Sequence, residues 1–243
     1  MNKAQIDFLN KLKRKKYRDK YGKFLVENPK VILEEYNSPL LDSVYATEKF
    51  FKEYEDLMAF DKVEIISEKA LDRVSSQVTP AGIIALFNLP KEKNFSFKTK
   101  HILLLDGIQD PGNLGTIIRT ADWFGWRAIF LGKNCVEPFN PKVVAASMGS
   151  IFRSHVYQDT DLVALIKDLK KERYTIATTD LHGGNIDTKE KENIALVIGN
   201  ESKGVSLEIK DIADKSFKIP KFGKAESLNA AVAAGIIMHK IKS

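Results

Sequence analysis

The stretch HILLLDGIQDPGNLGTIIRTADWFG, residues 101–125, carries the pattern that decides the fold. A short apolar run, HILLLD, leads into a loop with three glycines, and a helix-like segment follows. The alternation continues downstream, with strand-like runs at 128–132, 174–179, 194–199 and 216–220 and helix-like segments at 113–125, 141–149, 161–172 and 227–241. Short, almost wholly apolar strands separated by helices predict an α/β fold whose parallel sheet is covered on both faces.

The residues before this region also alternate between strand-like and helix-like segments, which indicates a second, smaller domain. A polar segment, KEKNFSFKTK at 91–100, lies between two apolar runs and marks the boundary. Upstream, strand-like runs at 41–47, 63–67 and 82–90 alternate with helix-like segments at 29–36, 47–57 and 67–75, the last with Ser67 as N-cap, and the basic stretch is expected to be helical into 24–28. We therefore expect two domains, a small α/β sandwich at 1–95 and a parallel-sheet domain at 96–243.

Composition narrows the classes of protein. The 243 residues are 44% hydrophobic and 29% charged, an ordinary balance for a globular chain that argues against disorder. No uncharged apolar run approaches the roughly 18 residues of a membrane span, and the N-terminus lacks an apolar signal-peptide core, so we expect no membrane and a cytoplasmic location. The single cysteine, Cys135, excludes an internal disulfide, fits a reducing cytoplasm and argues against a thiolate zinc site.

Basic residues gather near the N-terminus of a chain whose net charge is +6. Eight basic residues and one acid lie between Lys11 and Lys23, with Tyr17 and Tyr21 among them. Lysine and arginine bind phosphates and aromatic rings stack on unpaired bases, so we interpret this cluster as a nucleic-acid contact. The candidate residues are Lys13, Arg14, Lys15, Lys16 and Arg18. The alternative is a solvated helix face.

Three loops follow strand-like runs of the second domain, where ligands bind in an open parallel sheet. The first, DGIQDPGNLGTIIR at 106–119, is rich in glycine but has neither the dinucleotide-binding nor the P-loop spacing. Asn113 is positioned to cap the following helix, and Arg119 lies in the second turn of that helix. Taken alone, Arg119 is better explained as a surface salt bridge.

The other two loops lie nearer the C-terminus. GNESKGVS at 199–206 follows the apolar run IALVI, and its Glu201 either orients a ligand or belongs to an ordinary polar turn. IPKFGKAESLN at 219–229 leads into a helix rich in alanine, for which Ser227 is the expected N-cap. Asn229 by itself is explained equally well as a polar residue of the first turn.

Taken together and in this order, the loops resemble a known family. NLGTIIRTA at 113–121, VIGNESKGV at 197–205 and IPKFGKAESLNAAVAA at 219–234 resemble the three motifs of the SpoU (TrmH-like) branch of the SPOUT RNA methyltransferases. KYRDKYGKFLVENPKVILE at 16–34 and VTPAGIIALF at 78–87 resemble the L30-like substrate-binding domain that precedes the catalytic domain in ribosomal RNA members.

The resemblance implies a fold, a cofactor and a reaction. It implies a deep trefoil knot at the C-terminal end of the catalytic domain, which is a rare exception to normal chain topology. It also implies S-adenosylmethionine as cofactor, methylation of a ribose 2′-hydroxyl in RNA, a homodimer with the site near the subunit interface, and no metal. The matching positions are Arg119, Asn113, Glu201, Ser227 and Asn229 for catalysis, and Thr178, Thr179, Gly199, Asn200, Ile219 and Leu228 for the cofactor.

This sequence departs from the family pattern at a few positions. Lys221 stands where methionine is common, and Ala230-Ala231 replaces the usual Val-Ser. In the first domain Asn28 stands where glycine is common, and asparagine tolerates a positive φ better than other non-glycine residues. The arginine and the asparagines of the motifs are retained, so the resemblance still implies activity.

The chemistry leaves the role of Arg119 open. The leaving group of a sulfonium donor is neutral, so the reaction needs no metal, and the difficulty lies in the weakly nucleophilic hydroxyl. Arginine stays protonated in proteins, which favours gripping a phosphate or the ribose over acting as a base. Ribosomal RNA is the expected substrate. The alternatives are a transfer RNA methyltransferase, a non-catalytic RNA-binding protein, and a nucleotide-dependent oxidoreductase, against which the missing fingerprint argues.

Overall fold

The computed structural model describes residues 1–54, 62–91, 94–185 and 193–242, apart from the side chains of residues 181 and 182. Within these residues no helix is both long enough and apolar enough to cross a membrane. The chain forms two compact units, one of Met1–Lys91 with Phe139–Gly149 and the other of Glu92–Pro138 with Ser150–Ser243.

The first unit is built on a four-stranded sheet with the order β1-β4-β2-β3. Its strands are β1 Lys23–Val26, β2 Leu41–Thr47, β3 Val63–Ile66 and β4 Ile83–Asn88, and its helices are α1 Lys3–Lys11, α2 Lys15–Tyr21, α3 Pro29–Glu34, α4 Glu48–Glu53, α5 Glu68–Val74 and α7 Pro141–Ser147. Strands β2 and β3 are parallel, whereas β4 is antiparallel to both its neighbours. Leu9 of α1 and Leu71 of α5 pack on one face of the sheet with Ile84. On the other face the ring of Phe24 packs on that of Phe139, with centroids 4.9 Å apart.

Most of the elements expected in the first unit are confirmed. The strand at 41–47 has the expected bounds, and Ser67 caps α5 by accepting from the backbone N–H of Ala70. The expectation of helix at 24–28 is wrong. Gly22 ends α2 in a left-handed conformation with φ +62°, and β1 then pairs with β4. Asn28 has φ −87°, not a positive φ, and its side chain caps α3 by accepting from Val31 N–H.

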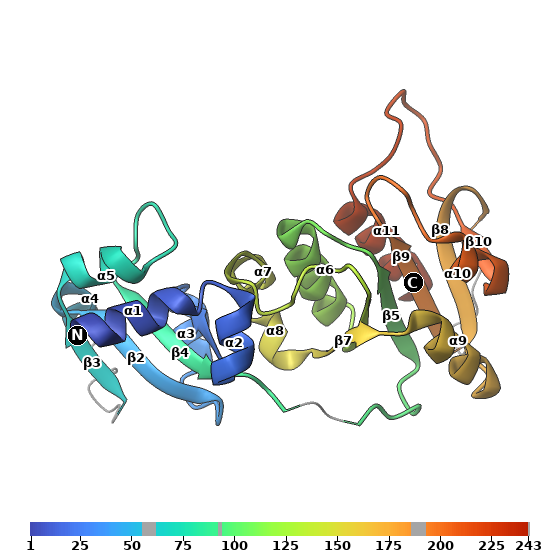
Figure 1. The fold of residues 1–243 in the computed structure, drawn as a ribbon. Helices are drawn as coiled ribbons and strands as arrows, with labels where there is room; N and C mark the ends of the chain where they lie inside the picture. The colour runs from blue at the N-terminus through green and yellow to red at the C-terminus, as the bar shows by residue number, and fades with distance from the viewer. Residues whose placement is uncertain (55–61, 92–93, 186–192, 243) are drawn as a thin grey trace. The chain divides into compact units, whose positions relative to one another are not determined.

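The second unit has a six-stranded sheet with the order β10-β8-β9-β5-β6-β7, in which every neighbouring pair is parallel (Figure 1). The strands are β5 His101–Asp106, β6 Ala128–Gly132, β7 His155–Thr160, β8 Thr175–Gly184, β9 Ile194–Gly199 and β10 Lys215–Phe217. The helices are α6 Pro111–Trp123, α8 Ser150–Arg153, α9 Leu162–Lys171, α10 Leu207–Ile212 and α11 Ala230–Lys242. The α/β class with a parallel sheet is therefore confirmed.

Burial on both faces explains why the interior of β5, residues 102–105, is wholly apolar. Ile102 and Leu104 belong to the core cluster that contains Ile166 of α9 and Ile209 of α10. Successive side chains of a strand point to opposite faces, so Leu103 lies on the other side, where it is also fully buried.

Several boundaries in the second unit differ from those expected. Helix α6 is capped by Asp110, whose carboxylate accepts from Asn113 N–H at 2.7 Å, so Asn113 is not the cap. Helix α11 begins at Ala230 and is capped by Asn229, so Ser227 is not its cap. Strand β7 and helix α10 were not expected, because HVYQDT is polar for a strand and LEIKDI is short for a helix.

Candidate functional site

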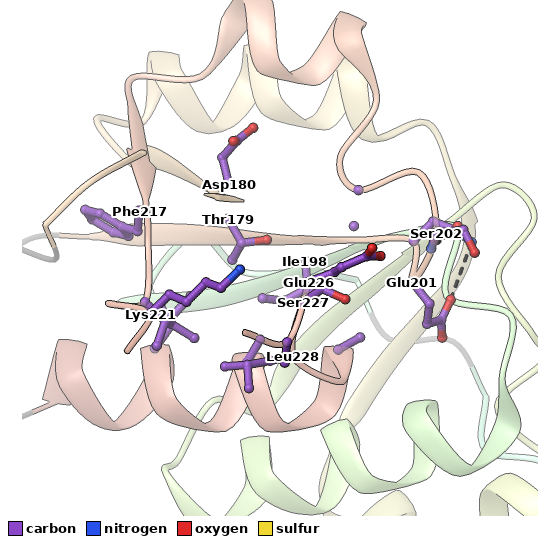
Figure 2. A pocket seen from close by; sticks show the side chains of 18 of the residues that line it. Thr179, Asp180, Ile198, Glu201, Ser202, Phe217, Lys221, Glu226, Ser227 and Leu228 are labelled. Carbon is purple, nitrogen blue, oxygen red and sulfur yellow. Dashed lines mark hydrogen bonds between the residues drawn. The ribbon is translucent and has the colours of Figure 1, made fainter. Parts of the chain in front are cut away.

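A cavity of about 590 Å³ lies beyond the carboxyl ends of β9 and β10 and beside β8 (Figure 2). Its size is typical of small-molecule sites. The turn after β9, the loop between β10 and α11, and the first turns of α11 supply most of the lining. The larger apolar side chains that line it are Ile198, Phe217, Ile219, Pro220, Phe222, Leu228 and Ile237, and the charged ones are Asp180, Glu201, Lys203, Lys210, Lys221 and Glu226.

The turn after β9 depends on a glycine. Asn200 and Gly204 exchange two backbone hydrogen bonds, of 3.0 and 2.9 Å, so the chain folds back on the strand end. A Cβ atom at Gly199 would lie 2.1 Å from the carbonyl carbon of Gly204 and 2.2 Å from the nitrogen of Val205. No larger residue fits there unless the turn moves.

Asn200 fixes this turn to the first glycine-rich loop. Its side-chain nitrogen donates to the Gly107 carbonyl at 2.7 Å. Its side-chain oxygen accepts from the backbone N–H groups of Ser202 and Lys203, at 3.0 and 3.1 Å. Asn200 therefore acts here through the backbone of its own loop and that of its neighbour.

Three motif residues from three loops form one hydrogen-bonded chain. The Asn113 side-chain nitrogen donates to a Glu201 carboxylate oxygen at 2.9 Å. The Asn229 side-chain nitrogen donates to the Asn113 side-chain oxygen at 2.7 Å. The Asn229 oxygen accepts from Ala231 N–H at 2.9 Å, which caps α11. Residues far apart in the sequence are thus joined around the edge of one cavity.

The remaining motif residues are placed differently from one another. Ser227 lines the cavity and is exposed. Thr179 also lines it, but Thr178 is buried, and its hydroxyl donates to the Lys215 carbonyl at 3.3 Å. Arg119 is exposed on α6, outside the cavity lining, and makes no ion pair or hydrogen bond with any described residue. No acidic residue in the described part of the chain therefore pairs with Arg119, as the interpretation of Arg119 as a surface salt bridge would require.

Residues 219–223 and 225–228 of the loop between β10 and α11 line the cavity. Across the described residues, the backbone N–H and C=O groups of 219–228 make no hydrogen bond to other protein groups. The apolar side chains of Ile219 and Leu228 lie beside these groups. Free main-chain donors and acceptors next to an apolar wall suit a nucleobase, which pairs through its edge and packs through its face.

The sequence did not predict one pair of charged residues in the cavity. Asp180 accepts from the Lys210 ammonium at 2.5 Å, and both residues line the cavity. Asp180 directly follows the strand-like run at 174–179, which was a signal that could have found it. Lys210 carried no such signal, because it comes from a helix that was not expected. No cluster of residues able to hold a metal ion occurs in the described ranges.

Comparison with known proteins assigns the family. Residues 100–239 match the model of the SpoU rRNA Methylase family, and residues 3–85 match that of the MRM3-like substrate binding domain. The chain belongs to the SpoU rRNA methylase family. The resemblance seen in the three loops is confirmed.

Relatives and solved structures of the SpoU-family protein agree with this assignment over nearly its whole length. It is 34% identical to the 23S rRNA (guanosine(2553)-2′-O)-methyltransferase RlmP of Bacillus subtilis, over 96% of this chain and 93% of RlmP. A TrmH-family structure from Porphyromonas gingivalis is 33% identical with a TM-score of 0.87, covering 99% of this chain and 98% of that one. The AdoMet-bound rRNA methyltransferase from Sinorhizobium meliloti is 26% identical with a TM-score of 0.84, covering 98% and 94%.

In the first unit of the SpoU-family protein, the basic cluster divides into exposed and anchored side chains. Arg14 and Lys16 are exposed, and Lys15 is exposed and pairs with Asp19 at 3.2 Å. Lys13 donates to the Ser75 carbonyl at 3.0 Å.

Arg18 differs from its basic neighbours because only 2% of it is exposed. Its guanidinium donates to the Leu12 carbonyl at 2.7 Å, which holds the connection between α1 and α2. A side chain buried in this way is not available to a nucleic acid, and the structure gives it a role in folding.

Proposed function

We propose that this SpoU-family protein transfers a methyl group from S-adenosylmethionine to a ribose 2′-hydroxyl of ribosomal RNA. The observation that carries the proposal is the hydrogen-bonded chain through Asn113, Glu201 and Asn229, which joins the three family motifs beside one cavity. The names of RlmP and of the AdoMet-bound neighbour support the reaction and the cofactor.

The residues present fit this cofactor. The free backbone groups of 219–228 suit the adenine edge, and Ile219 and Leu228 suit the adenine face. Gly199 and Asn200 shape the turn on the opposite side, and Thr179 lines the same cavity. When bound, S-adenosylmethionine supplies an electrophilic methyl group carried on a sulfonium. Transfer of the methyl group leaves a neutral thioether, so no metal is needed to stabilise the leaving group.

Arg119 activates the acceptor by position and charge. An arginine guanidinium is a cation with several N–H donors, so Arg119 binds a phosphate or ribose oxygen of the target nucleotide and stabilises the developing alkoxide, while the hydroxyl proton passes to solvent water. Glu201, held by Asn113, and Ser227, on the cavity lining, orient the groups around the reacting atoms. Holding the methyl carbon and the oxygen in line supplies much of the remaining rate enhancement.

RNA binding is assigned chiefly to the first domain, residues 1–95, and methyl transfer to residues 96–243. The match to a substrate-binding domain and the exposure of Arg14 and Lys16 support this division. Lys13 and Lys15 remain in the proposed contact set, whereas burial removes Arg18 from it.

We further propose a cytoplasmic homodimer whose catalytic domain ends in a trefoil knot. Trp123 on α6 is 85% exposed, and Val232 and Ile236 on α11 are exposed one turn apart. Helices α6 and α11 pack together, so a second copy that covers these side chains also approaches Arg119. The proposal of the knot rests on membership of the SpoU family.

The decisive experiment measures transfer of labelled methyl groups to ribosomal RNA and to transfer RNA transcripts, followed by mapping of the modified nucleotide. We expect 2′-O-methylation of ribosomal RNA only. Methylation of transfer RNA would show that the protein is a transfer RNA methyltransferase. S-adenosylmethionine binding without transfer to either RNA would indicate a non-catalytic RNA-binding protein, and binding of NADH in its place would indicate an oxidoreductase. Sedimentation of the same protein tests the dimer.

A further inference from the structure

We propose that residues 218–224 form a second RNA-binding element, located on the catalytic unit itself. In this element, which we call the 218–224 arm, Phe222 stacks on an unpaired base while Lys218, Lys221 and Lys224 contact phosphates. The inference rests on the proposed function, because it supposes that the target nucleotide is brought to the cavity beside the arm.

Phe222 is the first reason for the proposal. Its side chain is 98% exposed, although it belongs to the cavity rim. At this exposure, no side chain of the described residues covers the ring. Single exposed apolar residues are common, but this one stands beside the proposed methyl-donor site.

Charge is the second reason. Lys218, Lys221 and Lys224 are exposed, and none of them pairs with a described acidic residue. Lys210, in the same cavity, is by contrast neutralised by Asp180. Glu226 is the single acid between 218 and 229, so the arm keeps a net positive charge. Figure 2 shows the Lys221 side chain extending from this loop across the cavity.

The combination of an uncovered ring and separate ammonium groups fits single-stranded RNA better than a protein surface. Every base has a face on which an aromatic ring can stack, and lysines track the phosphates on either side. Bases that are splayed out of a helix are the usual targets of such contacts in RNA. Along the chain, Phe222 is flanked by Lys221, Gly223 and Lys224, so the exposed ring is bordered by two cationic side chains of the same arm.

Phe222 is tested first, with the full chain and an unstructured RNA oligonucleotide as probe. We expect Phe222→Ala to weaken RNA binding about tenfold, and Phe222→Trp to retain it. The affinity for S-adenosylmethionine, measured by calorimetry, is expected to stay unchanged in both variants. Leu207→Ala is the matched control, because Leu207 is also a strongly exposed apolar residue of this unit, 76% exposed, and lies outside the cavity lining.

The lysines are tested through salt dependence. Replacing Lys218 and Lys224 with glutamine is expected to lower the slope of log affinity against log salt by about 0.7 for each phosphate that the protein no longer neutralises. Lys167→Gln, an exposed lysine of α9, is the control and should leave the slope unchanged.

Three results would overturn the inference. RNA affinity that is unchanged in Phe222→Ala would show that the ring touches no base. A loss of S-adenosylmethionine affinity alone would assign Phe222 to the cofactor cavity. A change in sedimentation would assign it to a contact between protein copies. Failure of the proposed function is a separate outcome, seen as absent methyl transfer by the parent protein even though Phe222→Ala still weakens RNA binding.

Discussion

The Asn113 side-chain amide donates to the Glu201 carboxylate at 2.9 Å, across a separation of 88 residues. The two residues meet because β5 and β9 are parallel neighbours whose ends, Asp106 and Gly199, are directly paired. Loops that leave adjacent parallel strands start at the same edge of the sheet, so the first two motifs are neighbours as a consequence of strand register.

Removing the central residue of this network should weaken cofactor binding. Asn113→Ala removes the donor to Glu201 Oε1 and the acceptor of the Asn229 side chain, and an intramolecular hydrogen bond of this kind contributes about 0.5–1.5 kcal/mol. We expect roughly a tenfold loss of S-adenosylmethionine affinity by calorimetry, and a larger one for Asn113→Asp, which places two carboxylates together. Gln109→Ala, an exposed residue of the same loop, is the control. Equal affinities in Asn113→Ala and the parent would contradict a role for the network.

Arg119→Ala should abolish turnover without unfolding the protein. Arg119 is exposed and has no partner among the described residues, so its removal breaks no internal contact there. We expect the turnover rate to fall by roughly 100-fold or more, with the melting temperature and S-adenosylmethionine affinity nearly unchanged. Arg119→Lys should rescue poorly because it lacks the planar donor fork. Arg127→Ala, also exposed, is the control. Near-normal turnover in Arg119→Ala would exclude it from the active site.

Replacement by alanine should impair stability and cofactor binding at one glycine of the cavity and have no effect at another. Gly199→Ala places a Cβ atom 2.1 Å from the Gly204 carbonyl carbon, so the turn must move and both stability and cofactor binding should fall. Gly223→Ala meets no atom within 4 Å and should behave like the parent protein. Thermal melting and calorimetry on the two variants check this, and a Gly199→Ala variant that binds cofactor normally would show that the turn is not part of the site.

Acid should destabilise the protein through His101. Its ring stacks on Trp126 with centroids 4.9 Å apart, and desolvation, together with Lys242 and Lys100, lowers the pKa of His101 from 6.5 to about 4. The unfolded chain therefore binds more protons between these values, so the contribution to stability is complete above pH 6.5 and is lost as the pH falls to about 4. Allowing for partial exposure, we expect a loss of roughly 2 kcal/mol.

Urea unfolding at a series of pH values measures this effect. His101→Phe keeps an aromatic ring on Trp126 and removes the titrating group, so its stability should vary less over the same range. An identical pH dependence in the two proteins would exclude His101 as the cause.

Substitutions in the basic cluster should separate folding from RNA binding. Arg18→Gln removes a buried donor to the Leu12 carbonyl, so we expect a loss of about 1–3 kcal/mol in the free energy of unfolding. Lys16→Gln alters an exposed side chain, so it should leave stability unchanged and lower the salt slope of RNA binding. Denaturant unfolding and RNA titrations at several salt concentrations check both. A stable Arg18→Gln variant with weakened RNA binding would reverse the assignment.

The sequence predicts five of the six strands of the second unit, β7 being the exception, because burial on both faces leaves runs such as ILLL at 102–105 without polar residues. It predicts helix starts less well, because several capping residues compete at each one. Asp110 rather than Asn113 caps α6, and Pro111, which follows Asp110, suits the first helical position. Asn229 rather than Ser227 caps α11, and its side chain also donates to Asn113. The pair of Asp180 and Lys210 depends on how a helix is placed beside a strand, which local sequence patterns do not encode.

The main chain of 219–228, which makes no hydrogen bond within the described residues, allows cofactor binding and the choice of RNA to vary independently. Main-chain donors and acceptors are the same whatever side chains the loop carries, so a donor molecule held by them places little constraint on residues 221, 222 and 224. Under the proposed cofactor site and the proposed 218–224 arm, we expect selection or a laboratory library confined to these positions to change which RNA is bound while methyl transfer is retained.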